Sequence, residues 1–166
     1  MTAVARRSPA ELDLLMRELG TDLALEFPGP GGLWEDADLV GEPSPQRWPQ
    51  RQDLAVASGV DAAAQMLVNR LKTQRGELAS LGHPDYGSRH HELIGEPNIE
   101  RTRNLVKLHV LEAIAQEPRV EKVLSLQVSA PHDPPRSDVR IELDLLLVGE
   151  PVPLNLVVPF SFGVGR

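Results

Sequence analysis

The feature that most constrains this chain is a change of hydrophobic period after Pro118. Beyond that residue, apolar and polar positions alternate, which is typical of strands that bury one face. The clearest segment places five aliphatic residues on one side: Val139, Ile141, Leu143, Leu145 and Leu147. Similar segments lie near 123–128 and 152–160. We therefore predict a C-terminal three-stranded antiparallel meander.

Helical periodicity dominates the chain before this point. It predicts helices over 9–19 and 61–75, a short helix over 91–94, and a long one that starts near 97 and ends before Pro118. The long helix carries two adjacent apolar rows: Leu105, Leu108, Leu111 and Ala115, beside Val106, Val110 and Ile114. A strand over 53–57 precedes the second helix. The fold class is α+β, with helices packed on a small antiparallel sheet.

Two prolines define the character of the last strand. Pro153 and Pro159 have no N–H to donate to a neighbouring strand, so this strand should lie at a sheet edge. A free edge can accept an extended segment of another protein by main-chain hydrogen bonding. Leu154, Leu156 and Val158 mark the candidate interaction strand.

The first fifty residues differ in kind from the rest. Residues 21–50 contain five prolines, which break regular structure, and residues 1–50 contain nine acidic against four basic residues. We therefore assign 1–50 to a Pro/Gly-rich arm with short strands and 51–166 to a compact α+β domain. Three fragments of the chain look alike, at 22–25, 38–40 and 53–56. Trp34 and Trp48 are candidate anchors for a neighbouring subunit. The alternative is an arm that folds back on its own domain.

Composition excludes several classes of function. A formal charge of −7 and an aromatic content of 4% disfavour nucleic-acid binding, and the absence of cysteine removes disulfides and thiolate chemistry. No long apolar stretch predicts membrane insertion, and the cysteine-free chain suits a reducing cytoplasm. The histidines lack metal-ligand spacing, and no phosphate-binding or nucleophile motif is present. We predict no catalytic, cofactor or metal site.

The most informative short segment is Glu117-Pro118-Arg119, between the long helix and the first meander strand. A carboxylate beside the partial negative charge of a helix C-terminus requires a cation nearby. Pro118 fixes the turn, and Arg119 offers a planar donor fork for a carboxylate or carbonyl. The residues alone leave two interpretations open, a contact with another protein and an intrachain ion pair.

The order of these segments resembles a known family. Residues 53–160 resemble the baseplate wedge family known as GPW or gene product twenty-five, found in contractile phage tails, type VI secretion baseplates and phage-tail-like injection particles. The shared motifs are 53–59, Gln65 with 69–71, 76–78, the loop 82–88 and Glu117-Pro118-Arg119. The resemblance covers about two thirds of the chain and does not include the arm.

The resemblance implies a non-enzymatic role. It implies that Glu117, Pro118 and Arg119 dock the protein to other wedge proteins, that the sheet starts sheath assembly by strand exchange with sheath subunits, and that six copies surround the tail tube. Assembly in the cytoplasm and residence in a particle baseplate follow. Two alternatives are a lysozyme-like muramidase using Glu77 with Asp85 and a free-standing adaptor. The kind of machine, phage tail, secretion system or released particle, is left open.

Overall fold

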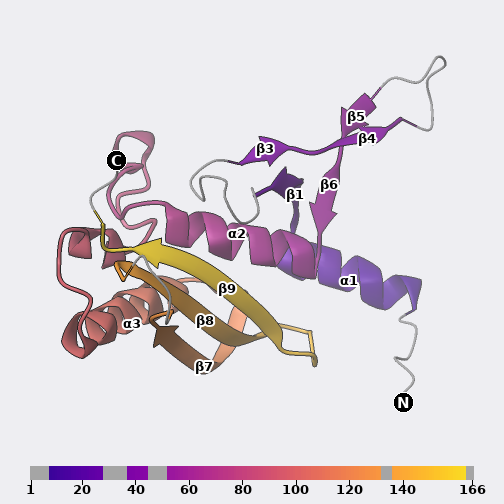
Figure 1. Cartoon of the computed structure of the whole chain (residues 1–166). Coiled ribbons are helices and arrows are strands. Elements are labelled where there is room, and N and C mark those ends of the chain that lie inside the picture. Colours follow the sequence, from indigo (N-terminus) through magenta and orange to yellow (C-terminus); the bar gives the residue numbers. More distant parts are fainter. Residues whose placement is uncertain (1–7, 28–36, 45–51, 132–135, 164–166) are drawn as a thin grey trace. The chain divides into compact units, whose positions relative to one another are not determined.

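The computed structural model describes residues 8–27, 37–44, 52–131 and 136–163 of the 166-residue chain. Its contacts divide the chain into two compact units, Met1–Gln65 and Met66–Arg166. The boundary falls inside the second helix, α2 (Val60–Lys72). Figure 1 shows the elements, and each unit is described here by itself.

The first unit opens with the predicted helix, α1 (Pro9–Leu19). Gly20 ends it with a φ of 90°, a backbone conformation that glycine adopts without strain. Leu19, the last helical residue, is completely buried. The C-terminal end of α1 therefore carries a fully buried side chain.

The three similar sequence fragments meet in one structure, which we call the three-strand junction. Its six short strands form three antiparallel pairs, β1 with β6, β2 with β3 and β4 with β5. Their bounds are β1 (Thr21–Leu23), β2 (Leu25–Glu26), β3 (Asp38–Leu39), β4 (Gly41–Pro43), β5 (Gln52–Leu54) and β6 (Val56–Ser58). Each fragment thus pairs with one neighbour before its midpoint and with the other after it.

A ring of backbone hydrogen bonds closes the centre of the junction. The N–H of Ala24 donates to the carbonyl of Ala55 at 2.8 Å, Val40 donates to Ala24 at 3.0 Å, and Ala55 donates to Val40 at 2.8 Å. The strand predicted over 53–57 is consequently two strands separated at Ala55, because that residue belongs to the ring. The side-chain amide of Gln65, on α2, also contacts the junction, donating to the Leu23 carbonyl and accepting from the Leu25 N–H, both at 2.8 Å.

Helix α2 ends earlier than the periodicity predicted. Its apolar side, which includes Leu67 and Leu71, is buried, but the helix stops at Lys72. The next residues pair with Ser88 instead: Ser88 N–H donates to the Thr73 carbonyl, and Arg75 N–H donates to the Ser88 carbonyl. Gly87 permits this approach, because a Cβ at that position would lie 2.5 Å from the Thr73 oxygen.

The second unit continues with two 3-10 helices, η1 (Ala79–Leu81) and η2 (Arg89–Leu93), and then α3 (Glu100–Ile114). Only one of the two apolar rows predicted on α3 is buried, the one containing Val106, Val110 and Ile114. Leu105, Leu108 and Leu111 are between 37% and 49% exposed. A helix on one layer of sheet can bury one stripe, and α3 turns the β-branched row inward.

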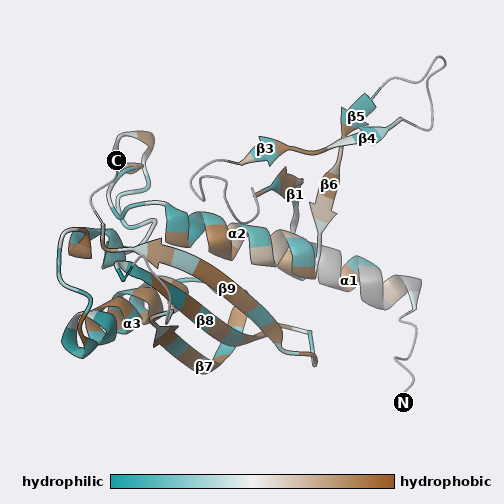
Figure 2. Cartoon of the chain, viewed as in Figure 1, coloured by the Kyte–Doolittle hydropathy of each residue, from teal (hydrophilic) through white to brown (hydrophobic). Residues whose placement is uncertain are grey.

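The predicted meander is present, and the fold class is α+β as expected. Strands β7 (Val120–Ser129), β8 (Asp138–Leu147) and β9 (Leu154–Ser161) form an antiparallel sheet in the order β7-β8-β9. Hydrophobic residues dominate the central strand and β9 in Figure 2. The buried positions on β8 are the predicted ones: Val139, Ile141, Leu143, Leu145 and Leu147.

Strand β9 lies at an edge of this sheet, as its prolines predicted. It pairs with β8 on one side, with Val158 opposite Ile141 and Pro159 opposite Arg140. The Phe162 N–H donates toward the β8 side, to the Ser137 carbonyl at 2.9 Å. Because the N–H groups of successive residues on a strand point to opposite sides, the amides of Asn155, Val157 and Ser161 point away from β8. In the described residues no strand pairs with that side.

A buried histidine completes the core near β9. His90 is 2% exposed, its Nδ1 lies 2.8 Å from the Ser88 hydroxyl, and its ring packs edge-on to Phe160 with centroids 4.8 Å apart. Burial, and to a lesser extent the neighbouring histidines His91 and His109, lowers the pKa of His90 from 6.5 to about 3. The folded protein therefore holds His90 neutral in mildly acidic solution.

This histidine should make the fold sensitive to acid. Since the unfolded chain binds a proton at His90 below about pH 6.5 and the folded chain does not, stability is full above that pH and falls toward pH 3. The loss in the free energy of unfolding that is due to His90 approaches about 1.4 kcal/mol per pH unit. Urea denaturation from pH 7 to 4 should show a shallower slope for His90→Gln than for the wild type. The exposed His83→Gln is the matched control, and equal slopes for wild type and His90→Gln would contradict the assignment.

Candidate protein-interaction site

The segment Glu117-Pro118-Arg119 forms a corner between α3 and β7 whose first residue is buried. Glu117 is 7% exposed, and its Oε2 accepts a hydrogen bond from Arg70 Nη2 at 3.2 Å. Arg70 comes from α2 and is itself 9% exposed. The cation that the helix C-terminus required is thus supplied by a residue 47 positions earlier. Glu117 ties two elements of the second unit together.

Tyr86 covers the other side of Arg70. The guanidinium carbon of Arg70 lies 4.6 Å from the centre of the Tyr86 ring, a cation–π arrangement. Burial raises the pKa of the Tyr86 hydroxyl; Arg70 opposes this shift and Glu117 adds to it. Among the described residues, Arg70 Nε is the buried side-chain polar atom without a hydrogen-bond partner. Arg70 therefore depends strongly on Glu117 for its polar contacts.

Arg119 emerges from this buried pair toward the surface. Its backbone N–H donates to Glu117 Oε1 at 3.3 Å, and its Nε lies 3.6 Å from the same oxygen. Its carbonyl accepts from Val148 N–H at 3.0 Å, which fixes the chain at the start of β7. The side chain is 37% exposed, and Pro118 beside it is exposed. The corner therefore exposes part of the Arg119 side chain, while the backbone of Arg119 is fixed by its hydrogen bonds to Glu117 and Val148.

The side chains of the three candidate residues of β9 are less accessible to another protein than the sequence suggested. Leu156 and Val158 are 8% and 1% exposed, and Leu154 is half-buried, because all three side chains face the core. Their backbone N–H and C=O groups point to β8, so these three residues belong to the candidate strand but do not form its outer edge. The outward amides belong to the alternate residues, of which Val157 is 45% exposed.

The remaining sequence-predicted residues are not brought to this corner. Trp34 and Trp48 lie outside the described residues. Glu77 is exposed and accepts the Gln74 N–H, while the Asp85 carboxylate is 75% exposed and pairs with Arg75 at 2.7 Å. Neither acid has the apolar surroundings that a glycosidase acid needs. In the described part of the chain no group of three metal-binding side chains occurs, and no helix there is long and apolar enough to span a membrane.

Sequence reasoning missed Arg70 and Tyr86 as members of the site. A signal for Arg70 was present, since it falls beside Leu67 and Leu71 on the side of α2 that carries the apolar stripe. A charged residue at such a position must find a partner when it is buried. Nothing in the local pattern identified that partner as Glu117.

Comparison with known proteins shows the family to which this chain belongs. A crystal structure at 1.44 Å of a protein from Geobacter sulfurreducens named "putative tail lysozyme" is similar, with 29% identity and a TM-score of 0.51 over 59% of this chain and 86% of that one. No curated protein sequence matches the chain significantly. The model of the baseplate wedge protein gp25 family matches residues 57–152, which is more than half of the chain and includes Arg70, Tyr86 and the Glu117 corner. The chain belongs to the baseplate wedge protein gp25 family.

Proposed function

We propose that this protein is a non-enzymatic structural component that joins the baseplate wedge to the sheath of a contractile tail or injection system and starts sheath assembly. Family membership supports the coarser part of this proposal, a structural role in a phage-tail baseplate. Six copies around the tail tube and assembly in the cytoplasm before incorporation are further parts of the proposal.

The observation that carries the sheath contact is the open edge of β9. Val157 pairs with Glu142 of β8 on one side, and its own N–H points to the other side, where no described strand lies. An extended segment of a sheath subunit could add there as a fourth strand, accepting the Val157 N–H and donating to outward carbonyls. Pro159 limits the number of amides on this edge, which disfavours indiscriminate strand pairing.

The wedge contact is assigned to the corner at Arg119. Its guanidinium is partly exposed and its backbone is fixed by Glu117 and Val148. Such a group can form a bidentate contact with a carboxylate of a neighbouring protein at little entropic cost. In this proposal Glu117 and Arg70 hold the corner and Arg119 makes the contact.

The lysozyme-like alternative lacks a supporting arrangement of acids. The described carboxylates whose pKa is shifted, Glu92 and Asp144, are both shifted downward, by hydrogen bonds from Arg89 and from Asn155 respectively. A general acid requires the opposite shift. The word lysozyme in the name of the Geobacter sulfurreducens protein is therefore not a basis for assigning hydrolysis to this chain.

Blocking the β9 edge tests the proposed function. We expect Val157→Pro to fold normally, since the lost N–H makes no bond to β8, and to enter baseplates, but to leave them without sheath. Val157→Ala, which keeps the N–H and shortens the same exposed side chain, is the matched control and should support full-length sheaths. Electron microscopy of particles from the native host measures the sheath. Normal sheaths on Val157→Pro baseplates would refute strand addition at this edge.

A further inference from the structure

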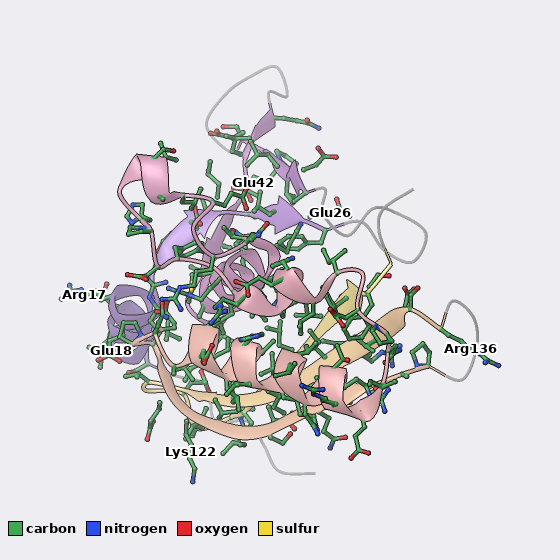
Figure 3. The ribbon with its side chains drawn as sticks, turned by 90° about the vertical axis from the view of Figure 1, so that its left-hand side faces the viewer. Arg17, Glu18, Glu26, Glu42, Lys122 and Arg136 are labelled. Carbon is green, nitrogen blue, oxygen red and sulfur yellow. The ribbon has the colours of Figure 1, made fainter. Side chains whose placement is uncertain are left out.

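The outer face of α3 carries an apolar row that the proposed function does not use. Leu105, Leu108 and Leu111 of this row are 37%, 49% and 39% exposed. The helix lies at the surface of the second unit, on the side that faces the viewer in Figure 3. A continuous row of exposed leucines on one helix is typical of a protein-binding surface. The charged residues beside the row indicate which partner it fits.

Two opposite charges lie on the same face of the helix as these leucines. An α-helix turns about 100° per residue, which puts four side chains within about 60° of one another: Arg101, Leu105, Leu108 and Glu112. We call these four residues the α3 seam. Arg101 is exposed and forms no ion pair with another described residue. Glu112 is 43% exposed, although its Oε2 lies 3.2 Å from His109 Nδ1. Both charges are therefore accessible to a partner.

The order of residues along the α3 seam is complementary to itself. The intervals between its members are four, three and four residues, with a cation at one end, an anion at the other and two leucines between them. A second copy of α3 that runs antiparallel to the first therefore puts Arg101 opposite Glu112, and it puts Leu105 opposite Leu108. A two-fold axis makes each of these contacts twice. The same intervals separate the a and d positions of a coiled-coil heptad, which are the positions that face a partner helix.

Charge selects the antiparallel arrangement over the parallel one. Parallel copies would bring Arg101 against Arg101 and Glu112 against Glu112, and like charges in apposition oppose association. The residues that flank the α3 seam include no lysine, arginine or acid that would repel its counterpart in the antiparallel pair: Asn104, His109 and Leu111. The apolar centre of the seam supplies the attraction, and the charges at its ends fix the direction and the register.

We propose that two copies of the free protein associate antiparallel through the α3 seam, with each copy's arginine paired to the other's glutamate and the leucines packed between them. The seam spans about 16 Å of helix, so the interface is smaller than the roughly 1,000 Å² of a stable complex and the dimer is weak and reversible. A dimer of this kind can dissociate when the protein enters a particle. The proposal goes beyond the proposed function, which does not use this face of α3.

Charge reversal with sedimentation velocity of the purified full chain tests the proposal. The wild type should shift from monomer toward dimer between about 10 µM and about 1 mM. Arg101→Glu and Glu112→Arg should each weaken association roughly ten-fold or more, because each change opposes like charges at two places in the dimer. An equimolar mixture of the two variants should associate again, since every facing charge in the mixed dimer meets its opposite, and this recovery also shows that both variants are folded.

The matched control is Arg140→Glu, which reverses a 66% exposed charge on β8 and should leave association at the wild-type level. A wild type that stays monomeric throughout this range would overturn the proposal. So would association that does not respond to the changes on α3, because another surface would then be responsible, or a mixture that fails to recover.

Disulfide trapping tests the antiparallel register independently. The chain contains no cysteine, so an introduced cysteine is its single thiol. Arg101→Cys mixed with Glu112→Cys should form a mixed disulfide, whereas either variant alone should not cross-link, because antiparallel copies separate equivalent positions by about 16 Å. Cross-linking of Arg101→Cys with itself at the rate of the mixture or faster would overturn the proposal. Both experiments use purified protein, so their outcomes do not depend on whether the proposed function is correct.

Discussion

Replacing Glu117 with alanine should lower the free energy of unfolding by about 3–5 kcal/mol, because it leaves the buried Arg70 guanidinium without its carboxylate partner. In the described part of the chain Arg70 Nε has no hydrogen-bond partner, and the guanidinium also contacts the Tyr86 ring. Urea denaturation monitored by circular dichroism measures the loss.

A double variant separates the effect of the buried charges from the effect of the volume that the two side chains fill. Arg70→Met with Glu117→Leu removes both charges and keeps similar volume, so it should recover most of the stability lost in Glu117→Ala. Pro118→Ala, at the exposed position directly after Glu117, serves as the control and should change stability little. A loss below about 1 kcal/mol for Glu117→Ala would show that the pair behaves like a surface salt bridge.

Of the two interpretations that the sequence left open, the intrachain pair is present, and the contact with another protein stays a prediction that we now place on Arg119. Glu117 forms the intrachain pair, through Arg70, whereas Arg119 keeps a partly exposed guanidinium. The residue types gave no means to divide these roles, because the division depends on which side chain is buried. That in turn depends on α2, which is distant in sequence.

The meander illustrates how much of this fold could be predicted from local pattern. Alternation of Val139 through Leu147 reports directly which side of a strand is buried, and Pro159 excludes a central position by its missing N–H. Both inferences require only the geometry of one strand. Strand order, the edge position of β9 and the α+β class followed from them correctly.

Long-range pairing explains where prediction ended. The two apolar rows of α3 were equally plausible as core, and packing on the sheet buried the row of Val106 and exposed that of Leu105. The similar fragments around Ala24, Val40 and Ala55 were visible, but their hydrogen-bonded ring joins residues as many as 31 positions apart. The contact of Arg70 with Tyr86 and Glu117 is of the same kind.

Replacing Arg119 with alanine should abolish incorporation into baseplates while leaving the protein folded. The side chain is 37% exposed and its 3.6 Å approach to Glu117 is a partly solvated contact, worth about 0–1 kcal/mol to stability. Truncating an arginine that is a main contact of an interface typically weakens the complex by 2 kcal/mol or more, which is roughly a thirty-fold loss of affinity. Cooperative assembly of several copies would enlarge this loss.

The central claim is that the molecule acts by presenting a fixed guanidinium to another baseplate protein. It is tested most directly by counting Arg119→Ala in purified particles by quantitative mass spectrometry, alongside the melting temperature of the isolated variant. Arg140→Ala, which removes a 66% exposed arginine from β8, is the matched control. We predict near-complete loss of Arg119→Ala from particles at a wild-type melting temperature, with Arg140→Ala retained. Wild-type incorporation of Arg119→Ala, or its unfolding, would contradict the account.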